Sequence, residues 1–322
     1  MDSNTKDKSL SIVIPVYNSK ETIERLVDEI ILALCKICPL EIILVNDRSS
    51  DNSEEICIGL HMRYKQIVSF FSLSRNVGEH NAVMAGLNQA KNEYVVIMDD
   101  DFQNPISEVI KMVDFASAND YDVVYSFYEK KKHSFFRNLG SSFNNWVANR
   151  MLPKPKDLYL SSFKVLNRFT VTEVIKYTDP FPYIDGLIFR VTSNIGKIGV
   201  EHHERESGKS GYTFKKLVSL WLNMFLNFSI LPLRVSIVLG FIFSGIGFVI
   251  GVFTVIEKLT NPHLPLGYTF TIVVISIYSG IMLISIGMVG EYLGRLFLSQ
   301  NKQPQYTIRK SFKREQPDIS KK

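Results

Sequence analysis

The stretch Tyr94–Pro105, with the sequence YVVIMDDDFQNP, constrains the fold of this 322-residue chain more than any other. Its first five residues form an apolar run that predicts a central strand, covered on both faces of a sheet. Three consecutive aspartates follow directly, and Pro105 suits the first turn of a helix after them. Ligands of open α/β sheets bind at the carboxyl ends of such strands. Because crowded carboxylates repel one another, the pattern favours a cation site over a simple acidic helix cap.

The side chains near this stretch also indicate the kind of cation. Oxygen ligands with no Cys or His beside them predict Mg²⁺ or Mn²⁺. The three cysteines form no even disulfide framework, and Cys35 and Cys38 lie in an apolar helical pattern that favours packing over zinc. His202 and His203 would point to opposite faces of a strand, so a metal site is not expected there.

Apolar and helical segments alternate along the first 130 residues. Strands are expected at Leu10–Val16, Leu40–Val45, Ile67–Leu73, Tyr94–Met98 and Tyr121–Phe127. Helices are expected at Glu21–Ile37, after a cap at Ser50 or Asp51, at Glu79–Ala90 and at Pro105–Ala118. This alternation predicts an α/β fold with βαβ units and a Rossmann-like, mostly parallel sheet. No GxGxxG follows the first strand and no GxxxxGK[ST] occurs, so neither a classical dinucleotide fold nor a P-loop is expected.

The hydrophobic surplus of the chain collects after residue 214, and it predicts a membrane protein. Residues 235–256 and 268–289 are uncharged stretches of 22 residues, each long enough to span a bilayer. Residues 214–232 and 133–152 have the mixed apolar and basic character of interfacial helices, and for 133–152 an ordinary core helix is the alternative. Basic residues flank the outer ends of the two spans, which places both termini in the cytoplasm. No signal peptide pattern precedes the first strand.

The charge of the chain is concentrated at its end. The formal net charge is +5, and residues 301–322 carry a net charge of the same size. This pattern predicts a basic cytoplasmic tail over residues 294–322, lying beside a membrane surface, and it argues against a nucleic-acid-binding domain.

Four motifs occur in order along the chain: IVIPVYN, VNDRSSDNS, LSRNVGEHNAVMAGL and DDDFQNP. Together they resemble the family 2 glycosyltransferases with the GT-A fold, and within them the membrane-bound polyprenyl-phosphate glycosyltransferases. The resemblance implies a GT-A catalytic domain over residues 1–213, two transmembrane helices within 233–293, and an inner-membrane location. It also implies inverting, metal-dependent transfer of one hexosyl group from a nucleotide-sugar, with UDP favoured, to undecaprenyl or another polyprenyl phosphate. The product would serve cell-envelope glycans such as lipopolysaccharide, and a homo-oligomer is expected.

The resemblance also implies the roles of individual residues. The nucleotide-sugar site is expected to comprise Pro15, Tyr17, Asn18, Asp47, Arg75, Asn76, Gly78, Asp99 and Asp100. Within it, Asp47 is expected to read the base. The catalytic residues are expected to be Asp99, Asp101, Gln103 and Asp157, with Asp99 and Asp101 as the metal pair. The acceptor phosphate is expected to bind Lys164, Arg205, Lys209 and Ser210.

Departures from the family pattern keep two alternatives open. Lys164 stands where relatives have arginine, and a lysine cannot make the bidentate fork to phosphate. Asp157 lies one residue further from it than in relatives. These changes leave room for a non-catalytic membrane-anchored scaffold. A processive polysaccharide synthase is the other alternative, although its QxxRW motif and larger set of spans are missing from the sequence.

Overall fold

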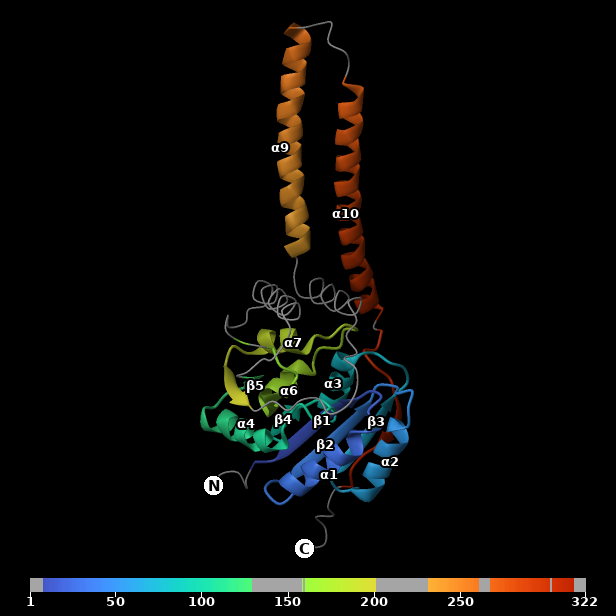
Figure 1. Ribbon diagram of the computed structural model, residues 1–322, viewed down its shortest axis with the longest axis vertical. Coiled ribbons are helices and arrows are strands. Elements are labelled where there is room, and N and C mark those ends of the chain that lie inside the picture. The colour runs from blue at the N-terminus through green and yellow to red at the C-terminus, as the bar shows by residue number, and fades with distance from the viewer. Residues whose placement is uncertain are drawn as a thin grey trace. The chain divides into compact units, whose positions relative to one another are not determined.

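The computed structural model describes residues 8–128, 158, 160–200, 231–260, 267–301 and 303–315 (Figure 1). The chain divides into two units. We call Met1–Thr213 with Pro304–Lys322 the sheet unit, and Phe214–Gln303 the helical unit. The last residues of the chain therefore belong with the first ones, although the whole helical unit separates them in sequence.

The described residues of the sheet unit form an eight-stranded mixed sheet in the order β7-β5-β6-β4-β1-β2-β3-β8. Its strands are β1 (Leu10–Val16), β2 (Leu40–Asn46), β3 (Val68–Leu73), β4 (Tyr94–Ile97), β5 (Val123–Tyr128), β6 (Lys164–Asn167), β7 (Ile195–Val200) and β8 (Ile308–Phe312). β1, β2, β3 and β4 pair in parallel, as do β5 and β7. The apolar runs explain the central strands, which are buried on both faces. All five strands expected from the sequence are present, with ends within two residues of the expected positions.

Helices cover both faces of this sheet. In the sheet unit they are α1 (Ile23–Leu34), α2 (Ser53–Arg63), α3 (Glu79–Leu87), α4 (Ile106–Ala118), α6 (Arg168–Val174) and α7 (Ile184–Val191). α1, α2 and α4 bury their apolar sides against the face that includes Ile12 and Ile14. α3 lies against the other face, where a Cβ on Gly86 would meet the side chain of Val13 at 2.3 Å. The close approach of helix and strand therefore requires glycine at this position.

Two strands lie outside the simple alternation expected from the sequence. β6 pairs antiparallel with both β4 and β5, so the fifth expected strand is not a neighbour of the fourth. β8 pairs antiparallel with β3 at the edge of the sheet. Residues 294–322, expected to form a basic tail, therefore contain the end of α10, which continues to Gln300, and the edge strand Ile308–Phe312.

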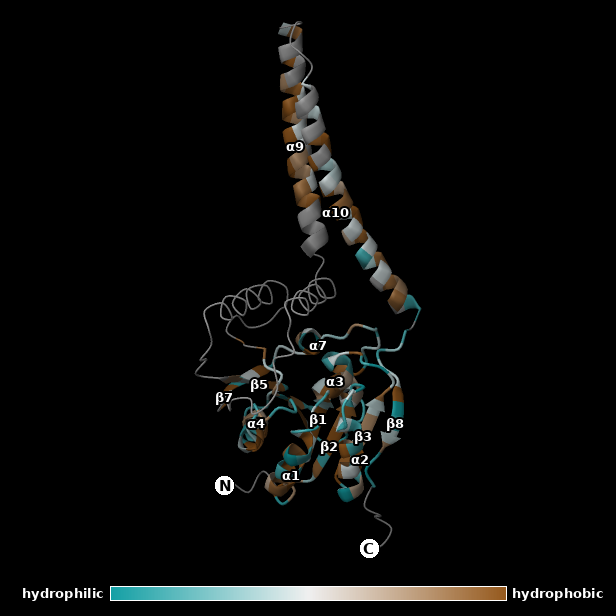
Figure 2. Ribbon diagram, turned by 45° about the vertical axis from the view of Figure 1, so that its right-hand side comes forward, coloured by the Kyte–Doolittle hydropathy of each residue, from teal (hydrophilic) through white to brown (hydrophobic). Residues whose placement is uncertain are grey.

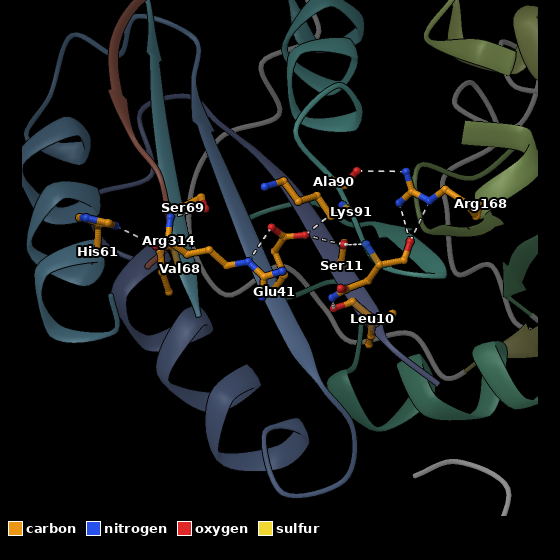
Figure 3. A network of polar contacts seen from close by, with 11 residues as sticks. Leu10, Ser11, Glu41, His61, Val68, Ser69, Ala90, Lys91, Arg168 and Arg314 are labelled. Carbon is orange, nitrogen blue, oxygen red and sulfur yellow. Dashed lines mark hydrogen bonds and ion pairs between the residues drawn. The ribbon is translucent and has the colours of Figure 1, made fainter. Parts of the chain in front are cut away.

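A polar network joins this last segment to the amino-terminal edge of the sheet (Figure 3). The side chain of Glu41 on β2 is only 3% exposed, and its carboxylate forms an ion pair of 3.0 Å with Arg314. The same carboxylate accepts hydrogen bonds from the Ser11 hydroxyl at 2.8 Å and the Lys91 backbone N–H at 3.1 Å. A buried carboxylate needs such partners, so the segment after β8 is part of the folded domain.

The helical unit consists, in its described residues, of two long helices, α9 (Leu231–Thr260) and α10 (Tyr268–Gln300). Hydrophobic residues run along most of both helices (Figure 2), and large ones such as Phe241, Phe248 and Leu283 are at least 70% exposed. Within the described residues, one stretch, Ile277–Leu298, is long and apolar enough to cross a membrane. A shorter apolar stretch, Ile237–Phe253, lies in α9. The expected interfacial segment 133–152 lies outside the described residues, as does 214–232 except for its last two residues, which begin α9.

Candidate nucleotide-sugar site

The loops after β1 and β2 meet at the carboxyl edge of the sheet and are hydrogen-bonded to each other. The Asn18 side-chain oxygen accepts from the backbone N–H of Ser50 at 2.8 Å, and the Asn18 backbone N–H donates to the Ser49 hydroxyl at 3.0 Å. Asn18 has a φ of 56°, a left-handed conformation that asparagine tolerates well. Tyr17 beside it is half exposed. The residues expected to bind the nucleotide-sugar therefore lie on two loops that hydrogen bonds hold together. Pro15 lies in β1, just before the first loop.

Asp47 is buried, and it holds the loop that contains the other expected nucleotide residues. Its two carboxylate oxygens accept the backbone N–H groups of Val77 and Gly78, at 2.8 and 2.9 Å. Burial raises the pKa of Asp47, and these two hydrogen bonds only partly oppose the effect. Gly78 has a φ of 89°, which disfavours other residues there. Arg75 and Asn76 are exposed on the same loop, so the structure gives Asp47 a loop-holding role beside the expected reading of the base.

The three aspartates after β4 have different hydrogen-bond partners, two of them in other segments. Asp99 accepts a hydrogen bond from the Ser162 hydroxyl at 2.5 Å, on the segment before β6. Asp100 accepts from the Ser19 hydroxyl and, at 3.4 Å, from the backbone N–H of Tyr17. Asp101 accepts from the backbone N–H of Gln103 at 3.1 Å. The cluster therefore ties the β1 loop, the β4 loop and the start of β6 together.

Burial and the crowding of the three carboxylates change the pKa of Asp100. Burial raises the pKa of Asp100 to about 6; the charges of Asp99 and Asp101 add to this effect, and the Ser19 hydroxyl opposes it. Within the described residues, no group of three or more His, Cys, Asp or Glu side chains has a geometry that holds a metal ion by itself. These carboxylates suit a cation that takes only two ligands from the protein and the others from phosphate oxygens of a bound ligand. They suit a cation coordinated by protein side chains alone less well.

The backbone directly after the aspartates has an uncommon conformation. Phe102 has a φ of 62°, a value that bulky residues rarely adopt. The guanidinium of Arg25, on α1, lies 4.2 Å from the centre of the Phe102 ring, within cation–π range. Strained residues of this kind concentrate at functional loops that the surrounding structure holds in place.

Lys164, expected to bind the acceptor phosphate, lies at the start of β6 and is paired within the protein. It is the register partner of Ile97, the last residue of β4, and its side chain is only 5% exposed. Its ammonium group forms an ion pair with Asp185 near the start of α7 and lies 4.9 Å from the centre of the Tyr125 ring. The Tyr125 hydroxyl also donates to Asp185, at 2.8 Å. A phosphate that binds Lys164 would have to share it with this carboxylate.

Two further titratable residues of this region were missed by the sequence analysis, Glu79 and His80 at the start of α3. Crowding around the Glu79 carboxyl raises its pKa above the ordinary value, with desolvation the larger cause and the charge of Asp99 adding to the effect. Burial lowers the pKa of His80 to about 4, so its imidazole is neutral at pH 7. Both lie inside the motif LSRNVGEHNAVMAGL, and this position could have identified them as candidate site residues from the sequence. Asp185 had no such signal.

Asp157, Arg205, Lys209 and Ser210 lie outside the described residues. Their catalytic and acceptor-binding roles therefore stay predictions from the resemblance.

The comparisons with known proteins establish the family. The model of the family Glycosyl transferase family 2 matches residues 11–175. Across 99% of this chain, the sequence is 32% identical to the undecaprenyl-phosphate 4-deoxy-4-formamido-L-arabinose transferase of Yersinia enterocolitica, of which 98% is covered. The protein of the same name from Yersinia pestis is 31% identical over the same shares. The chain belongs to glycosyltransferase family 2, and the resemblance seen in its motifs is confirmed.

The fold agrees with this assignment. A crystal structure of glucosyl-3-phosphoglycerate synthase from Mycobacterium tuberculosis, in complex with Mn²⁺ and uridine-diphosphate-glucose, superimposes with a TM-score of 0.50. The match covers 66% of this chain and 75% of that one, at 17% sequence identity. The fold is thus the α/β GT-A fold with a mixed, mostly parallel sheet.

Proposed function

We propose that this glycosyltransferase moves one sugar, with inversion, from a UDP-sugar to undecaprenyl phosphate at the cytoplasmic face of the membrane. The observation that carries the proposal is the crowded carboxylate cluster at the carboxyl edge of the sheet, where the pKa of Asp100 is raised to about 6. Such an edge suits a cation and a nucleoside diphosphate. The acceptor follows the name of relatives that match almost the whole chain.

The relatives' name also directs the choice of sugar. It specifies 4-deoxy-4-formamido-L-arabinose, which is a pentose, whereas the sequence analysis expected a hexosyl group. We therefore propose the UDP-linked 4-formamido pentose as the first donor to test, ahead of UDP-hexoses. Transfer of this sugar would serve the modification of lipopolysaccharide.

A divalent cation, Mg²⁺ or Mn²⁺, would be held by Asp99 and Asp101 together with the diphosphate of the donor. When bound, it would neutralise the charge that develops on the departing nucleoside diphosphate. The chain's own contribution is orientation, because the hydroxyls of Ser162 and Ser19 fix Asp99 and Asp100 from neighbouring elements. The neutral imidazole of His80 adds no positive charge that would compete for these carboxylates.

The acceptor needs little activation by the protein. A phosphate monoester has a second pKa of about 6, so it is largely a dianion at pH 7 and already nucleophilic. Its binding depends on positive charge near the sugar, which the family pattern assigns to Lys164, Arg205 and Lys209, with Ser210. The ion pair of Lys164 with Asp185 reduces the net charge that this lysine offers. We therefore assign the larger share of phosphate binding to Arg205 and Lys209.

We propose that both α9 and α10 span the membrane. β8 returns to the same sheet that the chain left before α9, and a chain that returns to one side must cross the membrane an even number of times. If α10 crosses through its stretch Ile277–Leu298, α9 crosses as well. Its 30 residues extend about 45 Å, more than the hydrocarbon core requires. Both termini then lie in the cytoplasm, and a homo-oligomeric assembly stays a prediction.

A transfer assay tests the enzymatic proposal. The purified full chain in detergent is incubated with undecaprenyl phosphate, Mn²⁺ or Mg²⁺, and radiolabelled UDP-sugars or GDP-sugars. We expect label to enter the lipid fraction from a UDP-sugar and to require the cation. Transfer that is unchanged in excess EDTA would refute the metal dependence, and the absence of transfer from every donor would favour a non-catalytic scaffold.

Cysteine labelling tests the topology. A cysteine introduced at His263, in the connection between the two helices, should react with an impermeant reagent from outside the cytoplasmic membrane. A reporter fused after Lys322 should be active in the cytoplasm. Labelling at position 263 only after lysis would contradict the two-span arrangement.

A further inference from the structure

A row of polar residues crosses three neighbouring strands at the carboxyl edge of the sheet. Asn46 ends β2, Ser72 is its register partner on β3, and Lys310 is the register partner of Ser72 on β8. Side chains alternate between the faces of a sheet. Since Leu44 and Phe70, two residues earlier on their strands, belong to the core that packs against α2, the row faces α2 as well.

Glu54, in the first turn of α2, accepts hydrogen bonds from all three residues of this row. The Lys310 ammonium donates to it at 2.5 Å, the Ser72 hydroxyl at 2.8 Å and the Asn46 amide at 3.1 Å. Burial acts to raise the pKa of Glu54, but the hydrogen bonds from Lys310 and Ser72 outweigh it and keep the pKa below its ordinary value. The side chain of Glu54 is 14% exposed, so its carboxylate is charged and largely enclosed.

The same hydrogen bonds continue into the loops of the nucleotide-sugar site. The side-chain oxygen of Asn46 accepts the backbone N–H of Ser49 at 3.0 Å, and the Ser49 hydroxyl accepts the backbone N–H of Asn18 at 3.0 Å. An uninterrupted path of hydrogen bonds therefore leads from Lys310 through Glu54 to the loops after β2 and β1. These loops carry Asp47 and Tyr17.

An irregularity in β8 brings Lys310 into this row. The register between β3 and β8 shifts between Ser72 and Leu73, so Arg309 has no register partner on β3. Such a bulge re-aims the side chain that follows it. Lys310 therefore lies opposite Ser72 and reaches Glu54, although it is exposed, as Arg309 beside it is. The register of β8 therefore determines that Lys310, and not the equally charged Arg309, lies opposite Ser72.

We propose that β8 positions the donor-binding loops, with Lys310 and Glu54 as positioning residues for nucleotide-sugar binding. The inference rests on the proposed function of the loops after β1 and β2. β8 follows α10 after a short connection, so the segment that leaves the helical unit also fixes the shape of the donor site.

The experiment compares Lys310→Met with Arg309→Met in the full chain. Both variants remove one positive charge from β8, but only the first removes a bond to Glu54. We expect Lys310→Met to raise the KM for the nucleotide-sugar about fivefold, the upper end of the range for a partly exposed ion pair, with kcat and the acceptor KM nearly unchanged. Lys310→Arg should restore the donor KM, and Arg309→Met should match the wild type.

Amide hydrogen exchange of residues 47–51 provides a readout that does not depend on catalysis. Lys310→Met and Glu54→Gln should speed exchange in this loop severalfold, and Arg309→Met should not. If exchange and donor KM are unchanged in both Lys310→Met and Glu54→Gln, the inference is wrong. It is also wrong if the donor and acceptor KM values rise together, as general loosening would cause. Should the wild type transfer no sugar at all, the proposed function fails, and the exchange comparison still decides whether β8 holds these loops.

Discussion

The two edges of the central sheet carry acidic residues in opposite circumstances. At the amino edge, the buried carboxylate of Glu41 has a cation, a hydroxyl and a backbone N–H as partners (Figure 3). At the carboxyl edge, Asp99, Asp100 and Asp101 lie side by side, and the pKa of Asp100 is raised to about 6. The first arrangement satisfies the charge within the protein. The second crowds like charges together, and a bound cation would relieve this repulsion.

This difference separates stability from function. Protein partners that neutralise a buried charge hold the fold together, and removing one of them destabilises the folded state. Carboxylates that repel one another are costly unless a ligand relieves the repulsion, so their presence at a strand end indicates binding. Changes at the amino edge should therefore alter stability, and changes at the carboxyl edge should alter catalysis.

The largest expected effect is at the carboxyl edge. Asp101→Ala should lower the rate of sugar transfer by about a hundred- to a thousandfold. It removes a ligand of the cation that would neutralise the charge on the departing nucleoside diphosphate. The thermal midpoint of the purified chain should stay close to that of the wild type. An equally large fall in the midpoint would mean that Asp101 serves the fold instead of the reaction.

The amino edge should respond in the reverse way. Arg314→Met should lower the free energy of unfolding by about 3 kcal/mol, since it leaves the Glu41 charge buried without its cation. Denaturant unfolding of the full chain in detergent measures the change. Adding Glu41→Gln to this variant should recover most of the loss. If the double variant is no more stable than Arg314→Met, the buried charge is not the cause.

A smaller effect is expected for the acceptor. If Arg205 binds the lipid phosphate, Arg205→Ala should reduce transfer efficiency at least about tenfold through the acceptor, with nucleotide binding nearly unchanged. Kinetics at varied undecaprenyl phosphate, together with UDP binding by calorimetry, separate the two. Loss of UDP binding with unchanged acceptor kinetics would show that Arg205 belongs to the nucleotide-sugar site instead.

The smallest effect concerns pH. The pKa of Glu54 in the folded protein lies below its ordinary value, so the pair with Lys310 stabilises the fold at neutral pH and loses this effect as pH falls below about 4. The difference in unfolding free energy between the wild type and Lys310→Met should accordingly shrink on acidification. A difference that stays constant from pH 7 to about pH 3 would contradict the assignment.

The sequence predicted the centre of the molecule well and its margins poorly. The strand Leu10–Val16 and the aspartates after β4 were placed correctly, because a continuous apolar run that ends in charged residues is a local signal. β8 was missed because IRKSF is short and basic, and its partner β3 lies more than 200 residues away. The pairing of Lys164 with Asp185 likewise depends on contacts between distant segments, which no spacing rule reveals.

Binding of Mn²⁺ in the presence of UDP tests the contrast between the two edges most directly. Titration of the full chain, followed by electron paramagnetic resonance of free Mn²⁺, should show one bound ion per chain. We expect Asp101→Ala to lose this ion and Glu41→Gln, a carboxylate change at the opposite edge, to keep it. Wild-type Mn²⁺ binding in Asp101→Ala, or its loss in a folded Glu41→Gln variant, would contradict the account.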